Sequence, residues 1–163
     1  MTDKHILVVL VEDKPGVMMR ISGLFTRRHF NIETISVGHT EKEGISRITL
    51  TAVGDMREVE QVMKQLNKLI DVLKVTRMED DSINRELALI KINTKDKDSK
   101  SELIQLVDIF RGRIVDVTQE SIVVEITGDR KKVDAFVNMV TTFGIKELAI
   151  TGVTAMSRGP KAT

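Results

Sequence analysis

The sequence contains no cysteine, no tryptophan and no tyrosine, and it has only five phenylalanines. Without cysteine, the chain has no disulfide, no thiol nucleophile and no cysteine-ligated zinc or iron–sulfur site. So few aromatic rings leave little surface on which nucleic-acid bases could stack. No apolar run approaches the ~20 residues of a membrane span, and residues 1–4 lack the pattern of a signal peptide. We therefore expect a cytoplasmic protein.

A surplus of charge of either sign is also missing. The chain carries 25 Lys and Arg residues against 24 Asp and Glu residues, for a net charge of +1 at pH 7. Because proteins that bind a phosphate backbone usually have a basic surplus, nucleic acid is not an expected partner. The 163 residues are 41% hydrophobic, which suits a globular protein of one domain or two small ones.

What the sequence does contain is hydrophobic periodicity. Six consecutive apolar residues at 6–11 predict a central strand, and the Pro-Gly pair at 15–16 ends it and opens a helix. A strand hairpin follows over 31–52. A second helix then begins at Asp55–Glu58, which has the spacing of a capping box, and a strand at 70–75 closes this unit.

The same order of elements begins again after a polar stretch. We expect a strand at 86–92 and then a helix capped by Ser99 and Glu102. A strand hairpin over 114–126 follows, then another helix, and a final strand at 145–150. The two halves share this order of elements but no obvious sequence.

Both halves therefore have the order strand, helix, strand, strand, helix, strand, and the helices carry a single apolar stripe. This pattern predicts an α+β protein of two ferredoxin-like βαββαβ units, each an antiparallel sheet with helices on one face. We place the first domain at residues 1–78, a linker at 79–84 and the second domain at 85–163.

The strand at 6–11 is apolar on both faces, whereas helices cover only one face of such a sheet. A large exposed apolar face is unusual on a soluble monomer. We expect the second unit or another copy of the chain to cover it, and we interpret the pattern as favouring a homodimer.

No residue pattern predicts a catalytic centre. His5, His29 and His39 lack the spacing of zinc ligands, and we interpret them as polar residues at strand ends. The sequence has no nucleophile elbow, no dinucleotide-binding fingerprint and no phosphate-binding P-loop. Acidic residues are frequent, but they lie mostly on predicted solvent faces of helices. We therefore predict a chain with no catalytic residues, no metal site and no cofactor of its own.

One enzymatic alternative is left open. The segment Gly16–Arg20 matches the Gly-Val-x-x-Arg fragment with which acylphosphatases, which also have a ferredoxin-like fold, cradle phosphate. The rest of that family's motif is missing, and Glu12 and Asp13 would repel an anion at this turn. An acylphosphatase-like hydrolase is the less favoured interpretation.

The turn after the first strand also suits a different ligand. At the N-terminus of the predicted helix, the backbone N–H groups of Gly16, Val17 and Met18 would lack partners, and the helix dipole favours negative charge there. Gly16 permits close approach of a ligand to the backbone. These features suit one small carboxylate, and on these residues alone a simple strand-to-helix turn fits equally well.

Longer segments carry a specific family resemblance. Asp13–Val17 after a strand, with Asn31-Ile32 after the next helix, resembles the ACT domain, a module that binds amino acids. Further segments along nearly the whole chain resemble the small regulatory subunit of acetohydroxyacid synthase, also called acetolactate synthase. These segments are 23–33, 46–49, 65–72, 85–91, 110–117 and 157–159.

The resemblance implies a non-catalytic partner of an enzyme. Small subunits of this family form homodimers through their ACT domains and bind a branched-chain amino acid, typically valine, at the interface. They bind the large catalytic subunit, on which thiamine diphosphate, Mg²⁺ and FAD are expected. They raise its activity and confer feedback inhibition in valine, leucine and isoleucine biosynthesis. Another amino-acid-sensing regulator of the ACT type is the alternative.

By position, the resemblance also implies an effector site. Its residues would be Asp13, Gly16, Val17 and Met18 from one chain, and Asn31 and Ile32 from the other. The helix N-terminus would take the carboxylate of the effector, and the asparagine side chain would orient its amino group. Several valine-sensitive relatives carry Asn where this chain has Asp13, which would either pair with the ammonium group of the effector or repel its carboxylate.

Overall fold

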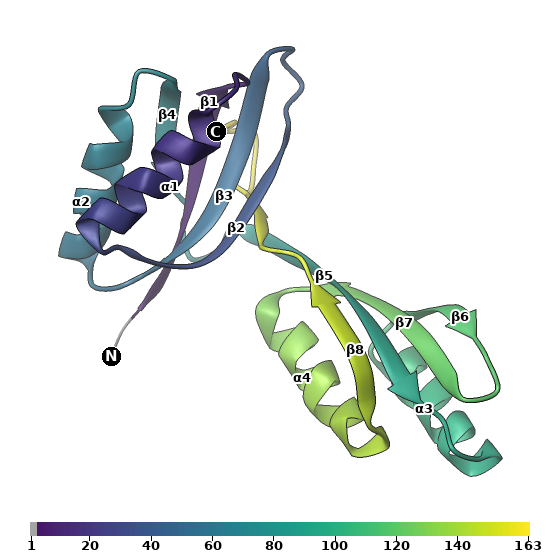
Figure 1. The fold of residues 1–163 in the computed structure, drawn as a ribbon. Coiled ribbons are helices and arrows are strands. Elements are labelled where there is room, and N and C mark those ends of the chain that lie inside the picture. The colour runs from purple at the N-terminus through teal and green to yellow at the C-terminus, as the bar shows by residue number, and fades with distance from the viewer. Residues whose placement is uncertain (1–2) are drawn as a thin grey trace. The chain divides into compact units, whose positions relative to one another are not determined.

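The computed structural model describes residues 3–163, which form two compact units (Figure 1). One unit comprises the described residues up to Ile83 together with Gly152–Thr163, and the other comprises Asn84–Thr151. No helix in this part of the chain is long and apolar enough to cross a membrane.

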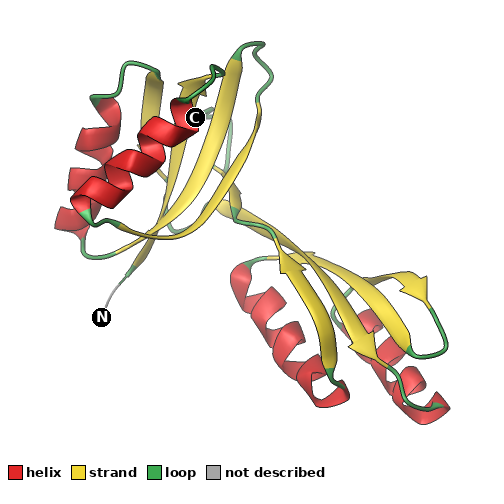
Figure 2. Ribbon diagram, in the orientation of Figure 1, coloured by secondary structure: helices red, strands yellow, loops and turns green. Residues whose placement is uncertain are grey.

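The first unit has the predicted order of elements. They are β1 (Lys4–Glu12), α1 (Val17–Arg28), β2 (Asn31–His39), β3 (Ile45–Val53), α2 (Met56–Asn67) and β4 (Val72–Arg77). The four strands pair antiparallel in the order β2-β3-β1-β4. Both helices lie on the same face of this sheet (Figure 2).

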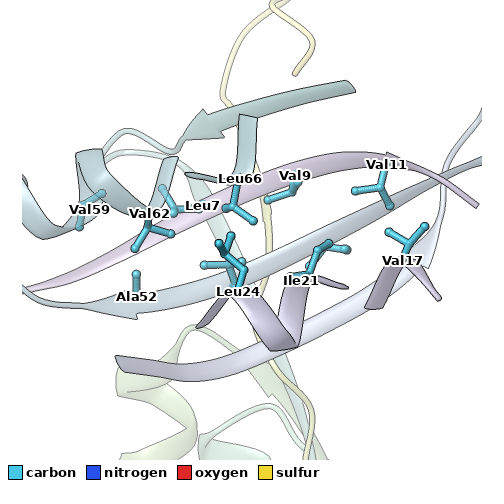
Figure 3. Packing of buried hydrophobic residues seen from close by; sticks show 12 residues of the cluster. Leu7, Val9, Val11, Val17, Ile21, Leu24, Ala52, Val59, Val62 and Leu66 are labelled. Carbon is cyan, nitrogen blue, oxygen red and sulfur yellow. The ribbon is translucent and has the colours of Figure 1, made fainter. Parts of the chain in front are cut away.

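The core of the first unit lies between its sheet and its two helices (Figure 3). Alternate residues of β1 face the helices, and each helix contributes a stripe of residues spaced by three and four positions. The labelled core residues are Leu7, Val9, Val11, Val17, Ile21, Leu24, Ala52, Val59, Val62 and Leu66. Because α1 contributes to this core from its first turn onward, the packing fixes where the helix begins.

The second unit repeats the topology with different residues. Its strands pair antiparallel in the order β6-β7-β5-β8, and its core surrounds Phe136, whose ring meets the Phe110 ring edge-on at a centroid distance of 5.3 Å. The predicted fold class, two ferredoxin-like βαββαβ units, is confirmed. The elements are β5 (Ile83–Asn93), α3 (Lys97–Ile109), β6 (Arg113–Val117), β7 (Ser121–Gly128), α4 (Arg130–Val140), a 3₁₀ turn (Thr141–Phe143) and β8 (Ile145–Ile150).

The second compact unit begins at Asn84, one residue before the predicted start at 85, but it ends earlier than predicted. Strand β5 begins at Ile83, inside the predicted linker 79–84. Residues 152–163 belong to the first unit, although the sequence places them in a second domain at 85–163. This returning segment contains only one short strand, β9 (Thr154–Met156), which is too short to show a periodic pattern.

The returning segment covers part of the sheet face that carries no helices. Val153 and Ala155 are buried in one cluster with Val8 and Met78. The Arg47 guanidinium donates a hydrogen bond to the Ala155 carbonyl, and desolvation by burial lowers the pKa of Arg47. The chain itself therefore covers Val8, so the apolar second face of β1 does not by itself require another copy of the chain.

The helix caps match the sequence in one case and not in another. Asp55 and Glu58 form the predicted capping box, with hydrogen bonds of 2.8 and 2.9 Å between each side chain and the backbone N–H of the other. The cap predicted at Ser99 is wrong, because α3 begins earlier and Asp96 accepts a hydrogen bond from the Ser99 N–H. Asp129 caps α4 in the same way.

Candidate functional site

The turn between β1 and α1 leaves backbone donors open at a helix N-terminus. Gly16 is the N-cap residue, with a φ of 87° that favours glycine, and no side chain caps this helix. Within residues 3–163, no acceptor bonds to the N–H groups of Gly16 and Met18. The Val17 N–H makes a long hydrogen bond of 3.4 Å to the Lys14 carbonyl, so the prediction of three unpaired donors is wrong for Val17.

Two neighbouring loops hold this turn in place. The Glu12 N–H donates to the carbonyl of Asp71, just before β4, at 2.9 Å. The Asp13 N–H donates to the carbonyl of Gly44, in the hairpin between β2 and β3, at 2.8 Å. Because both bonds join backbone groups, they fix the path of the chain on the approach to Gly16.

An arginine lies over the glycine of this turn. Arg20 is one helical turn after Gly16, and a Cβ atom added at Gly16 would lie 3.3 Å from Arg20 Nη1. The same guanidinium forms an ion pair with Asp71, whose side chain is only 9% exposed. The sequence patterns place Arg20 only in the acylphosphatase-like fragment and do not indicate Asp71. The spacing of four between Gly16 and Arg20, which puts both on one side of a helix, is the signal that could have found the arginine.

Two further charge pairs flank the turn. Lys14 pairs with Glu12, and the hydrogen bond that its ammonium group donates to the Glu12 carboxylate raises the pKa of Lys14. The carboxylate of Asp13 lies 3.9 Å from His39 Nδ1 at the end of β2, and both side chains are largely exposed. Asp13 is therefore the carboxylate at this turn whose charge no lysine or arginine balances in the described chain.

Asn31 and Ile32 lie at the other end of α1, at the start of β2 (Figure 1). The 12 residues of α1 span about 18 Å, so one chain does not bring these residues to the Gly16 turn. Ile32 packs against the core, whereas Asn31 is exposed and lines a cavity of about 310 Å³. The other residues that line this cavity are Arg28, His29, Phe30, Ala52, Val53, Arg57, Glu58, Val59, Gln61 and Val62.

Strand β2 is an edge of its sheet. Its residues Ile35 and Val37 pair with the core residues Leu50 and Ile48, which places them on the helix-covered face. They are nevertheless 40% and 50% exposed. An edge strand with exposed apolar side chains offers unpaired backbone groups and apolar area to another chain.

The remaining candidates for chemistry do not converge. His5 lies at the start of β1, His29 just after α1 and His39 at the end of β2. Within residues 3–163, no group of three or more His, Cys, Asp or Glu side chains could hold a metal ion. In the acylphosphatase-like fragment, Asp71 balances the charge of Arg20, which weakens the attraction that a phosphate dianion would need.

Comparison with known proteins identifies the family. Two family models match: the AHAS small subunit-like ACT domain over residues 7–74, and the small subunit of acetolactate synthase over residues 85–159. The chain belongs to the acetolactate synthase small-subunit family. The resemblance seen in the sequence is therefore confirmed, and the first unit contains the ACT domain.

Similar proteins match over both units. The probable acetolactate synthase small subunit of Methanothermobacter thermautotrophicus is 55% identical over 160 residues, which cover 98% of this chain and 95% of that protein. The Bacillus subtilis acetolactate synthase small subunit is 49% identical over 158 residues, covering 96% and 91%. The crystal structure of the acetolactate synthase small subunit from Thermotoga maritima has a TM-score of 0.91 and 43% identity, and covers 98% of this chain and 99% of that one.

Proposed function

We propose that this small subunit binds a branched-chain amino acid, valine, raises the activity of the large catalytic subunit and makes that activity sensitive to valine. Family membership over nearly the whole chain carries the assignment of a regulatory subunit. Thiamine diphosphate, Mg²⁺ and FAD belong, in this proposal, to the catalytic subunit. The present chain supplies the sensor and no reacting group.

The proposed sensor is a homodimer of ACT domains. Two copies would place their β2 edges and α1 helices side by side around a two-fold axis, covering Ile35 and Val37. In this arrangement the two α1 helices would be antiparallel, so the Gly16 end of one helix would face the Asn31 end of the other. Sedimentation should then show a dimer at micromolar concentration. A monomer both with and without valine would contradict this arrangement.

Each end of the interface would contribute a different part of the effector site. The open N–H groups of Gly16 and Met18 would bind the carboxylate of valine, with the helix dipole favouring its charge. Asp13 of the same chain, together with the partner subunit's Asn31, would hold the ammonium group. The isopropyl group would occupy the cavity near Asn31, where Ala52 and Val59 are apolar lining residues.

Mixing the purified chain with its cognate large subunit tests this function. We expect acetolactate formation to rise on mixing and to fall again as valine is added, whereas the small subunit alone should form no acetolactate. The control is the large subunit with and without valine. Equal activity of the large subunit in the presence and absence of this chain would contradict the proposal.

A further inference from the structure

We propose that Arg20 binds the carboxylate of the effector directly, and that Asp71 is the positioning residue that holds the guanidinium over the Gly16 turn. This inference rests on the proposed function and adds a residue to it, because the effector site implied by the family resemblance contains neither Arg20 nor Asp71.

The guanidinium of Arg20 lies at the open turn. Arg20 Nη1 lies 3.3 Å from the Cβ position of Gly16, and therefore close to the glycine of the open turn. The Arg20 side chain is 47% exposed, so it is accessible to a small molecule. An arginine has five N–H donors, and the ion pair to Asp71 uses Nη2, which leaves donors for a second carboxylate.

The residue that holds Arg20 in place is buried. The Asp71 side chain is nine-tenths buried, and no hydrogen bond satisfies its Oδ2 among residues 3–163, so its charge depends on the ion pair to Arg20. A buried carboxylate that lost its cation would be strongly unfavourable. Asp71 therefore keeps a long and flexible side chain in one place beside the turn, which lowers the entropic cost of binding a ligand there.

The charges around the turn nearly balance. The pairs Arg20–Asp71 and Lys14–Glu12 are each neutral in sum, and Asp13, which precedes Gly16 in the same turn, adds one negative charge. This arrangement suits a zwitterion, with its carboxylate towards Arg20 and its ammonium group towards Asp13. An amino acid has this charge pattern, whereas a phosphate dianion does not.

The same helix contains a matched control. A Cβ atom added at Gly23 would lie 3.6 Å from Arg27 Nη1, so this pair repeats the spacing of Gly16 and Arg20. This pair lies inside α1 and not at its N-terminus. Inside the helix, the backbone N–H groups already bond to carbonyls of the same helix. Arg27 also forms no ion pair within the described residues. Arg27→Gln thus removes an arginine from α1 without touching the turn.

The experiment compares valine with valinamide, in which a neutral amide replaces the carboxylate, by calorimetry on the full chain. We expect wild type to prefer valine. Arg20→Gln should lose at least about tenfold in valine affinity, the effect of one charge-assisted hydrogen bond, and much less in valinamide affinity. Arg20→Lys should retain part of the preference, and Arg27→Gln should leave it unchanged.

A purely structural role of the ion pair predicts a different result. Arg20→Gln would then weaken valine and valinamide by the same factor, and that outcome would overturn the inference, as would unchanged affinity for both. Unfolding in urea checks that the variant is folded at the temperature of the titration. If wild type binds valine and Gly16→Asp abolishes binding while Arg20→Gln does not, only the role of Arg20 is wrong. If wild type binds no valine, the effector proposal fails together with this one.

Discussion

The two units share one topology but treat the turn after their first strand differently. In the second unit, Asp96 occupies this turn and its carboxylate accepts the Ser99 N–H at 2.7 Å, which lowers the pKa of Asp96. In the first unit, Gly16 occupies the turn and no side chain caps the helix. The same fold therefore satisfies a helix N-terminus with its own carboxylate in one unit and leaves it without a side-chain cap in the other, where we propose that the carboxylate of the effector binds.

The largest effect is expected when the Gly16 turn is given a carboxylate like that of the Asp96 turn. Gly16→Asp introduces a carboxylate where we expect the carboxylate of valine to bind, at a backbone conformation that disfavours a side chain. We expect valine affinity to fall about a hundredfold or more, from lost charge-assisted hydrogen bonds and repulsion between like charges. Activation of the large subunit should persist. Calorimetry measures the valine affinity of the variant, and a valine titration of the reconstituted enzyme measures its activation and inhibition. If the enzyme with Gly16→Asp is inhibited by valine as strongly as wild type, the proposed site is wrong.

A second test concerns the far end of α1. Asn31→Ala removes the side chain that we expect to contact the ammonium group from the partner subunit, and valine affinity should fall about tenfold because that hydrogen bond is charge-assisted. The same calorimetric titration checks it. Asn84→Ala, in the second unit, serves as the comparison. If Asn31→Ala binds valine as tightly as wild type, the asparagine has no role in the site.

Sequence patterns predict most of the fold because most of it rests on local signals. The apolar stripes and the capping box at Asp55 and Glu58 involve residues within a few positions of each other. The error at the C-terminal end of the second domain involves contacts between distant positions, such as the burial of Val153 against Val8. The Arg20–Asp71 pair is of the same kind, since no periodicity links a helix residue to a loop that precedes a distant strand.

The candidate site divides in the same way. Gly16 follows from turn chemistry, and its positive φ agrees with the choice of glycine. The family resemblance adds Asn31 as a residue of the opposite chain, which no spacing within one sequence indicates. Because the length of α1 separates these two residues, the proposed site needs a second chain.

A third prediction addresses the capped unit. Asp129→Ala removes the cap of α4, where the side chain accepts the Lys132 N–H at 2.9 Å. The free energy of unfolding should fall by about 1 kcal/mol, while valine affinity should not change. Urea unfolding followed by circular dichroism measures the first quantity and calorimetry the second. If Asp129→Ala lost as much valine affinity as Gly16→Asp does, the proposal that only the first unit binds valine would be wrong.

The smallest expected effect is a pH dependence of stability. The hydrogen bond from Ser99 holds the pKa of Asp96 below its ordinary value of 3.8 in the folded chain. Asp96 therefore stabilises the fold above the unfolded-state pKa, and this contribution is lost as the pH falls through the folded-state pKa. Stability of wild type relative to Asp96→Asn should decrease as the pH is lowered below about 4. A difference that is constant between pH 7 and pH 3 would contradict this assignment.

The central claim is that two chains build each effector site, and mixing two defective variants tests it most directly. Gly16→Asp and Asn31→Ala homodimers should each bind valine poorly, since every site has one damaged half. After unfolding and refolding the two together, mixed dimers contain one site with both halves intact. Calorimetry should then recover about a quarter of the wild-type number of tight valine sites. If the mixture binds no more valine than the separate variants do, the site does not lie between two chains.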